Sequence, residues 1–439
     1  MADNAIRLLY SPLADGLIMV SEEDAEKIER CLETDGTCFS EEIADAADEL
    51  RYTFNHEIAF AVPDVQKITK MSVIPNNRCN FSCSYCYSAE GRNGHEISWT
   101  ALKTALDWFI NPVRFDGNVE VSLSLFISGG GEPLLSWGNI TRRMLEYARR
   151  RADEFGFSLR LMVISNGSLV TPDIARRLAE LDVSVGVSFE VLPELQESQR
   201  GHYNEVVRGL EVLRENGVTT LMNSTITPQS VHRMKEMYCE VRDRWPFVKR
   251  YTMEPVTGSG LFKSAKELHR FYDAFFEGYL RCKTMENEKQ NENGNGGKGP
   301  ELRFTFDDEY RDICVRHCPG KFSITPEGTI SVCHLVSSPK EERYSDCVYG
   351  TINETSITTD HERFTYLYRR NVSAYPECDN CFAKWICGGE CLTRRATYPA
   401  DYLAEVCRFN RRFVKHQLIG RVRNEVKEAY GMSLEEFVK

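Results

Sequence analysis

Three cysteines lie close together in the chain: Cys79, Cys83 and Cys86, separated by three and then two residues. Three thiolates in one loop can bind three corners of a 4Fe-4S cluster and leave the fourth iron without a protein ligand. A structural zinc site takes four ligands and commonly shows two separated pairs, which a lone triplet with no nearby histidine does not match. The spacing therefore indicates a cluster with an open coordination site, suited to chemistry rather than to electron transfer alone.

A second group of cysteines occupies the C-terminal third of the chain and includes C-x2-C spacing. Eight thiolates can fully coordinate two 4Fe-4S clusters. A pair of zinc sites is the alternative, because C-x2-C by itself is also a zinc signature. Cys347 is an additional cysteine that could replace Cys314 as a ligand. The eight residues are Cys314, Cys318, Cys333, Cys378, Cys381, Cys387, Cys391 and Cys407.

The amino-acid composition and net charge argue against nucleic-acid binding and membrane association as main functions of the chain. With 65 acidic against 54 basic residues and a net charge of -11, the 439-residue chain is not expected to have a nucleic-acid backbone as its main partner. No stretch of about 18 uncharged apolar residues occurs, and the N-terminus lacks the layout of a secretory signal, so we expect no membrane partner and a cytoplasmic location. Cytosolic disulfides are rare, so sixteen cysteines indicate metal or redox chemistry.

The elements that must position the triplet are apolar runs, each followed by an amphipathic helical segment. Repeated strand-helix units imply a parallel sheet with right-handed crossovers. Six units predict an α/β fold with a partial (β/α)6 TIM-like barrel, open on one side. The triplet directly follows the first run, at the barrel end where such enzymes keep their active sites. The six runs are Lys70 to Pro75, Leu123 to Ser128, Leu159 to Ser165, Val183 to Phe189, Thr219 to Thr227 and Arg250 to Val256.

Flanking segments complete the predicted organisation. Residues 1–65 read as two short strands, RLLYSPL and GLIMVS, before a helix that opens with a capping pair, Ser21 and Asp24. This pattern predicts a winged-helix-like module, and a simple extension packed on the main domain is the alternative. The barrel domain is expected over 66–300, ending in a polar, Gly- and Asn-rich linker from Met285 to Pro300. A loop-rich iron-sulfur domain over 301–410 and a packed C-terminal helix over 411–439 would follow.

The triplet, with the aromatic Tyr85 just before its third cysteine, resembles the signature of the radical S-adenosylmethionine (radical SAM) family. Gly130-Gly131-Glu132-Pro133 resembles the family's GGEP motif, and Ile164 to Gly167 resembles its TNG segment. Val187 to Glu190 matches an SLDG-like strand end, although Glu190-Val191 replaces the usual Asp-Gly. The resemblance implies that S-adenosylmethionine (AdoMet) is bound by Tyr85, Gly130, Gly131, Glu132, Asn166, Ser188 and Arg200.

The resemblance also implies roles and a reaction. Glu132 would face the amino group of AdoMet, while Ser188 and Arg200 would lie near its carboxylate and ribose. One electron from the cluster would split the sulfonium and give a 5′-deoxyadenosyl radical, which abstracts a hydrogen atom from the substrate. A reductant such as flavodoxin or ferredoxin would supply that electron.

The C-terminal cysteines resemble the SPASM domain of peptide-modifying radical SAM enzymes. That resemblance implies two auxiliary 4Fe-4S clusters, and so three 4Fe-4S clusters in all. It implies that the first auxiliary cluster is held by Cys314, Cys318, Cys333 and Cys391, and the second by Cys378, Cys381, Cys387 and Cys407.

The resemblance extends to the substrate class. Sulfatase maturases have Cys-Asp where this chain has Cys333-His334, and the surrounding residues are similar to those of maturases of ribosomally made peptides. We therefore expect a crosslink, thioether or carbon-carbon, in a precursor peptide whose leader binds the N-terminal module. Oxidation of a protein Cys or Ser to formylglycine is the alternative, and a zinc-bound interaction module is the non-enzymatic one. Glu254, at the sixth strand end, is a candidate catalytic acid or base, or else a structural carboxylate.

Overall fold

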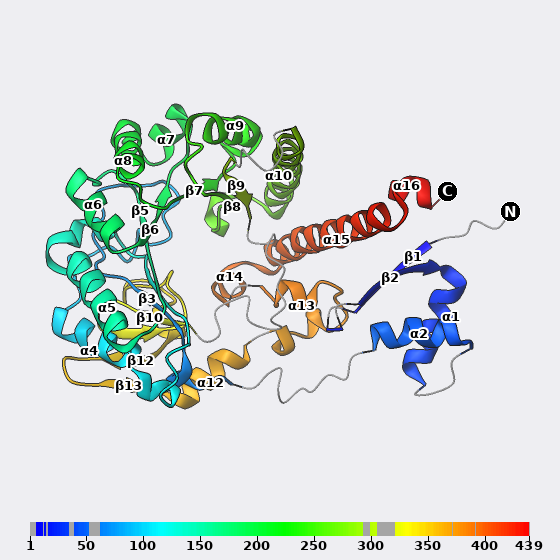
Figure 1. Ribbon diagram of the computed structural model, residues 1–439, viewed down its shortest axis with the longest axis horizontal. Helices are drawn as coiled ribbons and strands as arrows, with labels where there is room; N and C mark the ends of the chain where they lie inside the picture. The colour runs from blue at the N-terminus through cyan, green and yellow to red at the C-terminus, as the bar shows by residue number, and fades with distance from the viewer. Residues whose placement is uncertain are drawn as a thin grey trace.

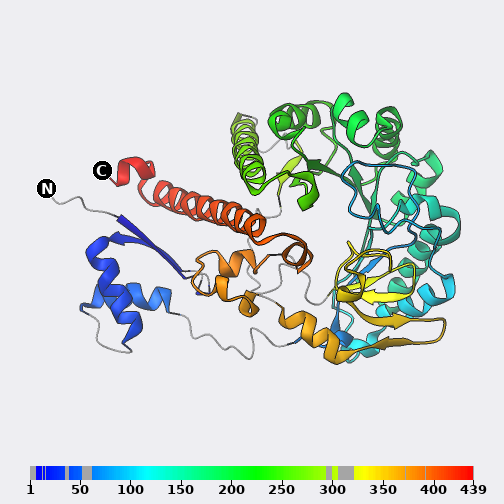
Figure 2. The same cartoon turned by 180° about the vertical axis from the view of Figure 1, so that it is seen from behind.

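The computed structural model describes residues 6–11, 13–14, 16–34, 39–51, 62–292, 299–304, 321–370, 372–390 and 392–438. An 11-stranded sheet in the order β13-β12-β11-β10-β3-β4-β5-β6-β7-β8-β9 forms its centre, and β1 pairs with β2 in a separate hairpin. Figures 1 and 2 show the large sheet wrapped by helices, with the N-terminal hairpin and its two helices set apart from it.

The predicted partial barrel is confirmed. Each of the six predicted apolar runs is a strand, and neighbouring strands pair in parallel. The strands are β3 (Lys70–Val73), β4 (Leu123–Ile127), β5 (Leu159–Ser165), β6 (Val183–Ser188), β7 (Thr220–Ile226) and β8 (Arg250–Pro255). The helices around them are α4 (Trp99–Phe109), α5 (Arg142–Phe155), α6 (Pro172–Glu180), α7 (Pro193–Gln199), α8 (Tyr203–Glu215), α9 (Met234–Arg244) and α10 (Ala265–Glu292).

Alternation along each strand gives the barrel two different faces. On β5, Leu159, Leu161 and Val163 are buried in the main core, whereas Arg160 and Met162 between them are more exposed. Successive side chains of a strand point to opposite faces, so one face packs under the helices and the other lines the barrel interior. The interior face is therefore the less buried face of the strands.

The sheet continues past the predicted domain boundary at residue 300. Strand β9 (Glu301–Arg303) pairs in parallel with β8, and β10 (Phe322–Ile324) pairs in parallel with β3 at the opposite edge. Both barrel edges are therefore covered by chain from the C-terminal region, which satisfies backbone groups that open edge strands would expose. Strands β11 (Thr329–Ser331), β12 (Val348–Ile352) and β13 (Ile357–Thr359) then follow in antiparallel pairing.

Two helices extend beyond the predicted bounds of their segments. Helix α10 runs to Glu292, so residues 285–292 are helical and not linker. This stretch is free of Gly and Pro and consists mainly of Glu, Lys, Gln and Asn, which extend an existing helix at small cost. Helix α15 (Ala400–Tyr430) begins directly after Pro399, earlier than the predicted 411, because Pro favours the start of a helix.

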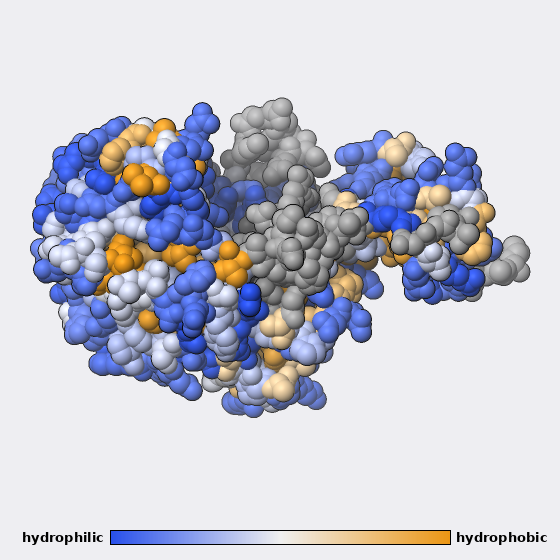
Figure 3. Space-filling model, turned by 90° about the horizontal axis from the view of Figure 1, so that it is seen from below, coloured by the Kyte–Doolittle hydropathy of each residue, from blue (hydrophilic) through white to orange (hydrophobic). Residues whose placement is uncertain are grey.

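The C-terminal region contains short helices before α15. They are α11 (Tyr344–Cys347), α12 (His361–Arg369), α13 (Lys384–Cys387) and α14 (Leu392–Thr397), and α16 (Leu434–Phe437) ends the chain. Helix α15 packs on α10, where the rings of Tyr272 and Phe409 stack with centroids 4.2 Å apart. None of the described helices combines the length and apolarity needed to cross a membrane. Seen from below, the surface is mainly hydrophilic, with small apolar patches on the barrel (Figure 3).

The N-terminal module consists of the hairpin β1 (Ile6–Ser11) and β2 (Gly16–Ser21) and helices α1 (Glu22–Glu33) and α2 (Glu41–Leu50). The predicted cap is present, since Ser21 Oγ accepts from the Asp24 N–H at 3.1 Å. The module has a small core of its own. Tyr10 and Met19 instead pack against the main core. Residues 52–61 lie outside the described residues, and the winged-helix-like assignment of residues 1–65 stays a prediction.

Candidate functional site

The cysteine triplet lies on the loop after β3, and we call residues 79–86 the cluster loop. The Cys86 N–H donates to the Cys83 carbonyl at 3.2 Å. Burial raises the pKa of Cys79 and Cys83, and the neighbouring thiols raise it further. Arg92 Nη2 donates to Cys86 Sγ at 3.5 Å, and the positive charge of Arg200 lowers the pKa of Cys83 in part. The loop thus gathers three thiols and two guanidinium groups.

Three thiols on one loop match the ligand set of a 4Fe-4S cluster. In a 4Fe-4S cluster each thiolate binds a different iron, so the thiols surround the group and need not meet at one point. The nearby guanidinium groups match the negative charge that thiolate ligands carry.

The glycine turn after β4 packs directly on the backbone that leads into the cluster loop. The Gly131 N–H donates to the Asn76 carbonyl at 3.0 Å. A Cβ on Gly131 would lie 1.8 Å from the Arg78 carbonyl oxygen, so only glycine fits there. Gly130 has φ +63°, and its Cβ would lie 2.5 Å from Ile74 Cγ2. The predicted glycines are therefore needed for close backbone approach.

Glu132 is almost fully buried and joins two strand ends. Its carboxylate accepts from Ser165 Oγ at 2.8 Å, from the Asn166 N–H at 2.7 Å and from the Leu134 N–H at 3.0 Å. Burial raises its pKa, and these donors oppose that effect. The sequence did not suggest this bridging role. The predicted contact of Glu132 with the amino group of AdoMet stays a prediction.

Asn166 connects the end of β5 to the cluster loop. Its Nδ2 donates to Asn80 Oδ1 at 2.9 Å, and its Oδ1 accepts from the Ser168 N–H at 3.0 Å. Asn80 Nδ2 in turn donates to Ser168 Oγ at 2.9 Å. The predicted cofactor residue thus lies beside the triplet.

Tyr85 and Arg200 are brought together by Glu190, which stands where the family pattern has Asp. The Tyr85 hydroxyl donates to Glu190 Oε1, and Arg200 Nη1 donates to the same hydroxyl at 3.0 Å. Glu190 is fully buried, which raises its pKa, whereas Arg200 and Tyr85 lower it in part. The sequence signal that could have identified Glu190 as a site residue is its position as a charged residue directly after an apolar strand.

The two remaining predicted residues lie on strands beside β7. Ser188 pairs in register with Asn223, and Glu254 pairs with Thr225. Both are partly exposed and fall on the less buried face of their strands, which lines the barrel interior. Their predicted roles in AdoMet binding and in acid-base chemistry stay predictions.

Electrostatic influence links four C-terminal cysteines, and their assignment to one ligand set stays a prediction. Burial, followed by Cys407 and Cys381, raises the pKa of Cys378 to about 11. Burial is also the main cause that raises the pKa of Cys387 to about 12, and Cys407 contributes. Asn410 Nδ2 donates to Cys387 Sγ at 3.4 Å.

The other predicted auxiliary set can be followed only in part. Cys333 is buried at the end of β11, and the Val332 N–H donates to the carbonyl of the equally buried Cys347 at 3.0 Å. The chain after Cys333 also reaches the glycine turn, because a Cβ on Gly129 would lie 2.4 Å from the His334 carbonyl oxygen. Cys314, Cys318 and Cys391 lie outside the described residues.

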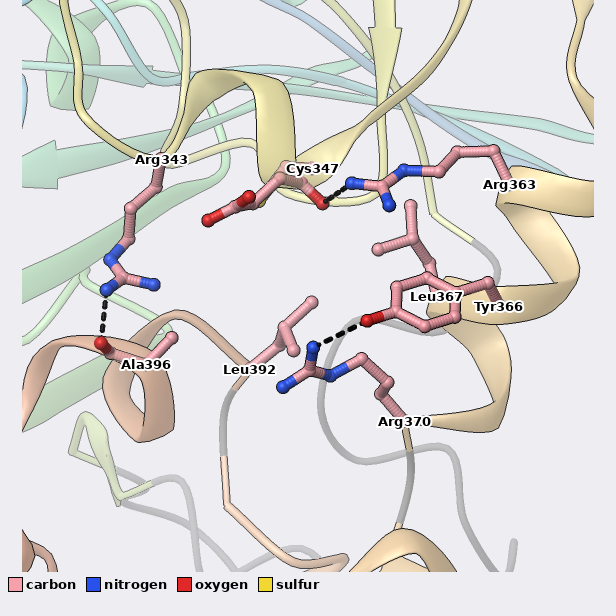
Figure 4. Close-up of a pocket in the computed structure, with 9 residues that line it drawn as sticks. Arg343, Cys347, Arg363, Tyr366, Leu367, Arg370, Leu392 and Ala396 are labelled. Carbon is pink, nitrogen blue, oxygen red and sulfur yellow. Dashed lines mark hydrogen bonds between the residues drawn. The ribbon is translucent and has the colours of Figure 1, made fainter.

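A pocket of about 100 Å³ opens between α11, α12 and α14 (Figure 4). Three arginines line it: Arg343 donates to the Ala396 carbonyl, Arg363 Nη2 to the Asp346 carbonyl at 2.9 Å, and Arg370 to the Tyr366 hydroxyl at 2.9 Å. The pocket is separate from the cluster loop.

Comparison with known proteins finds a family model that matches most of the barrel strands. Residues 73–238 match the family model of the Radical SAM superfamily. The radical SAM cyclopropyl synthase TigE of Paramaledivibacter caminithermalis is 26% identical over 183 residues, which are 37% of this chain and 36% of TigE. The AdoMet-dependent heme synthase of Oleidesulfovibrio alaskensis is 26% identical over 357 residues, which are 74% of this chain and 83% of that protein.

A solved structure shares the fold. Native anSMEcpe with bound AdoMet superposes with a TM-score of 0.59 at 16% identity, covering 81% of this chain and 99% of that one. Three curated relatives, TigE among them, are matched over 54%, 36% and 60% of their own length.

Proposed function

We propose that this chain, whose residues 73–238 belong to the Radical SAM superfamily, is a peptide maturase. It generates a 5′-deoxyadenosyl radical, abstracts a hydrogen atom from a ribosomally made precursor peptide and installs a thioether or carbon-carbon crosslink. The observation that carries this proposal is the cluster loop, where three thiols and two guanidinium groups meet at the carboxyl end of the first barrel strand.

Cys79, Cys83 and Cys86 would hold the cluster, which when bound supplies the electron for cleavage of the AdoMet sulfonium. The protein's own contribution is binding and exclusion of water. The glycine turn brings backbone close to the loop, Glu132 places negative charge beside it, and Asn166 fixes Asn80 within it. The less buried faces of the strands would leave the substrate space.

The N-terminal module would recognise the leader of the precursor. Within the described part of the module, strand β1 pairs with β2 alone, and Ile6 and Leu8 on it are 43% and 36% exposed. An extended peptide can add to such an edge, where backbone hydrogen bonds give affinity and apolar contacts give specificity.

The C-terminal domain would hold the auxiliary clusters. Cys407 and Cys381 lie close enough to Cys378 to raise its pKa, and Cys407 also raises the pKa of Cys387, which supports one shared ligand set. Cys333 would belong to the other cluster, with Cys347 beside it as a further ligand candidate. A small electron-transfer protein such as flavodoxin or ferredoxin would reduce the enzyme.

A tetrapyrrole substrate is the second candidate. It is favoured by the alignment with the AdoMet-dependent heme synthase, which spans 74% of this chain. The two candidates differ in what the N-terminal module does, because only a peptide maturase needs a strand edge for a leader. Incubation with iron-coproporphyrin and with candidate precursor peptides, each followed by mass spectrometry, separates them.

The decisive experiment measures 5′-deoxyadenosine after anaerobic reconstitution with iron and sulfide. We expect the wild-type protein to release it with AdoMet and dithionite, and the triple variant Cys79→Ala, Cys83→Ala, Cys86→Ala to release none. Cys239→Ala on α9 is the matched control and should behave as the wild type. Equal release by the triple variant, or stoichiometric zinc in a colourless protein, would overturn the proposal.

Product analysis then tests the reaction type. A peptide that has lost two hydrogens and holds a protease-resistant linkage indicates a crosslink. An aldehyde that reacts with a hydrazide indicates formylglycine and would replace the crosslink in this proposal.

A further inference from the structure

Glu190 occupies a strained turn at the end of β6. The Leu192 N–H donates to the Glu190 carbonyl at 2.7 Å, which closes a three-residue turn around Val191. Val191 has φ +65°, a conformation that β-branched residues rarely adopt. Such strain persists only where the surroundings enforce it, and it commonly marks functional positions. Here Val191 is fully buried in the main core, which holds the turn in place.

Buried amide groups fix the same turn from the other side. The Glu190 N–H donates to Gln196 Oε1 at 2.9 Å, and Gln196 Nε2 donates to the Gly201 carbonyl at 2.7 Å. Gln196 is fully buried. The backbone positions of Glu190 and of the Arg200-Gly201 pair are therefore set by one side chain.

The Glu190 carboxylate is directed at the cluster loop. Its Oε1 accepts from the Tyr85 hydroxyl and from the Thr225 N–H at 3.2 Å, while Oε2 is buried without a hydrogen-bond partner in the described part of the chain. Arg200 donates to the same Tyr85 hydroxyl at 3.0 Å, and its charge reaches both Glu190 and Cys83. A buried carboxylate with one free oxygen is costly unless a cation lies near it, and Arg200 provides that cation.

The cluster loop touches this segment at further points. The Ser84 N–H donates to the Gln199 carbonyl at 2.9 Å. The rings of Phe81 and His202 stack with centroids 4.6 Å apart. Residues 190–202 therefore form one wall along the cluster loop, and Glu190 is the buried acidic group of that wall.

We propose that Glu190 is a positioning residue for the cluster loop: it anchors Tyr85 and keeps the Arg200 guanidinium beside Cys83. This inference rests on the proposed radical SAM function. The family pattern would place Asp-Gly here, and the longer Glu, held by the strained Val191 turn, is what reaches Tyr85 in this chain. Its negative charge also opposes the effect of Arg200, which by itself would favour the reduced, more negative cluster.

The test uses the EPR signal of the reduced cluster that changes when AdoMet is added, since this signal belongs to the cluster with the open iron. Two quantities are measured on the reconstituted full chain: the rate at which a chelator removes the signal, and the midpoint potential. The variants are Glu190→Ala, Glu190→Gln and Tyr85→Phe. Glu194→Gln, an exposed glutamate in the same segment, is the matched control.

Loss of the Tyr85 anchor should loosen the loop, so Glu190→Ala and Tyr85→Phe are expected to lose the signal about tenfold faster than the wild type. Glu190→Gln keeps an oxygen for Tyr85 and should restore retention to within about twofold. Glu190→Gln also removes the negative charge of Glu190, which should make reduction of the cluster easier and so raise the midpoint potential. Tyr85→Phe and Glu194→Gln should leave the midpoint potential unchanged.

Wild-type retention in both Glu190→Ala and Tyr85→Phe, or a wild-type potential in Glu190→Gln, would overturn the inference. Circular dichroism and thermal unfolding of the cluster-free variants identify a variant that fails to fold, in which case the other two still decide. A wild-type protein without any AdoMet-responsive signal would instead count against the proposed function itself.

Discussion

Asn166 and Asn80 are hydrogen bonded through their side-chain amides at 2.9 Å, although 86 positions separate them in the chain. One residue ends the third barrel strand and the other lies inside the cluster loop, between its first two cysteines. The loop that would hold the cluster is therefore tied to the part of the barrel predicted to bind AdoMet.

Asn166→Ala should weaken this tie. It removes one donor to Asn80 and leaves the Ser168 N–H without its acceptor, so we expect the free energy of unfolding to fall by about 1–3 kcal/mol. Urea denaturation of the cluster-free protein measures the loss. Asn216→Ala, which removes a single hydrogen bond at the end of α8, should cost less. Equal losses in the two variants would show that the Asn80 network adds nothing.

Gly131→Ala should disrupt the junction of the glycine turn and the cluster loop. The new methyl would lie 1.8 Å from the Arg78 carbonyl oxygen, which is backbone and cannot move aside cheaply. We expect a loss of about 1–3 kcal/mol in unfolding free energy and reduced iron content after reconstitution. Gly94→Ala, where nothing lies within 4 Å of the added Cβ, is the control and should stay within about 0.5 kcal/mol of the wild type.

Glu405 should make the contact between α10 and α15 depend on pH. Burial raises its pKa, but hydrogen bonds from Arg408 Nε and His269 Nδ1, both 2.8 Å long, outweigh burial and lower it. A lowered folded-state pKa contributes stability above the unfolded value of about 4.3 and loses it as the pH falls through the folded value.

The measurement compares the Tm of cluster-free wild type and Glu405→Gln between pH 7 and pH 3. We expect the wild type to be more stable by about 1 kcal/mol at pH 7 and the difference to shrink as the pH falls below about 4.3 and through the lowered folded-state pKa. A difference that stays constant over this range would rule out the ionised Glu405 as its source.

Ile6→Asp combined with Leu8→Asp should weaken binding of the leader if the peptide adds to the β1 edge. The Kd for the leader is expected to rise about tenfold or more, because negative charge replaces the apolar contacts on that strand. Release of 5′-deoxyadenosine without peptide should be unaffected. Val113→Asp, at a side chain that is 79% exposed on η2 (Pro112–Phe115), serves as the control. An unchanged Kd would show that the leader does not bind at the β1 edge.

Local sequence determined the barrel strands and the start of the first helix. Apolar runs such as Leu159 to Ser165 predicted strands to within one or two residues, and Ser21 predicted the cap that begins α1. These features depend on neighbours in the chain, so alternation and capping chemistry suffice to find them. Cysteine spacing likewise placed the triplet on one loop.

Tertiary structure alone decided what lies against that loop. The pairing of β10 with β3, and the meeting of Glu190 with Tyr85, join residues far apart in sequence whose local patterns do not encode a partner. In the sequence, Glu190 was only a mismatch to the family's Asp-Gly pair. The structure shows that the buried turn at Val191 places the Glu190 carboxylate beside the cluster loop. The roles of side chains that act through long-range contacts can be assigned only from the folded structure. Their burial and their neighbours, and not their residue type, determine these roles.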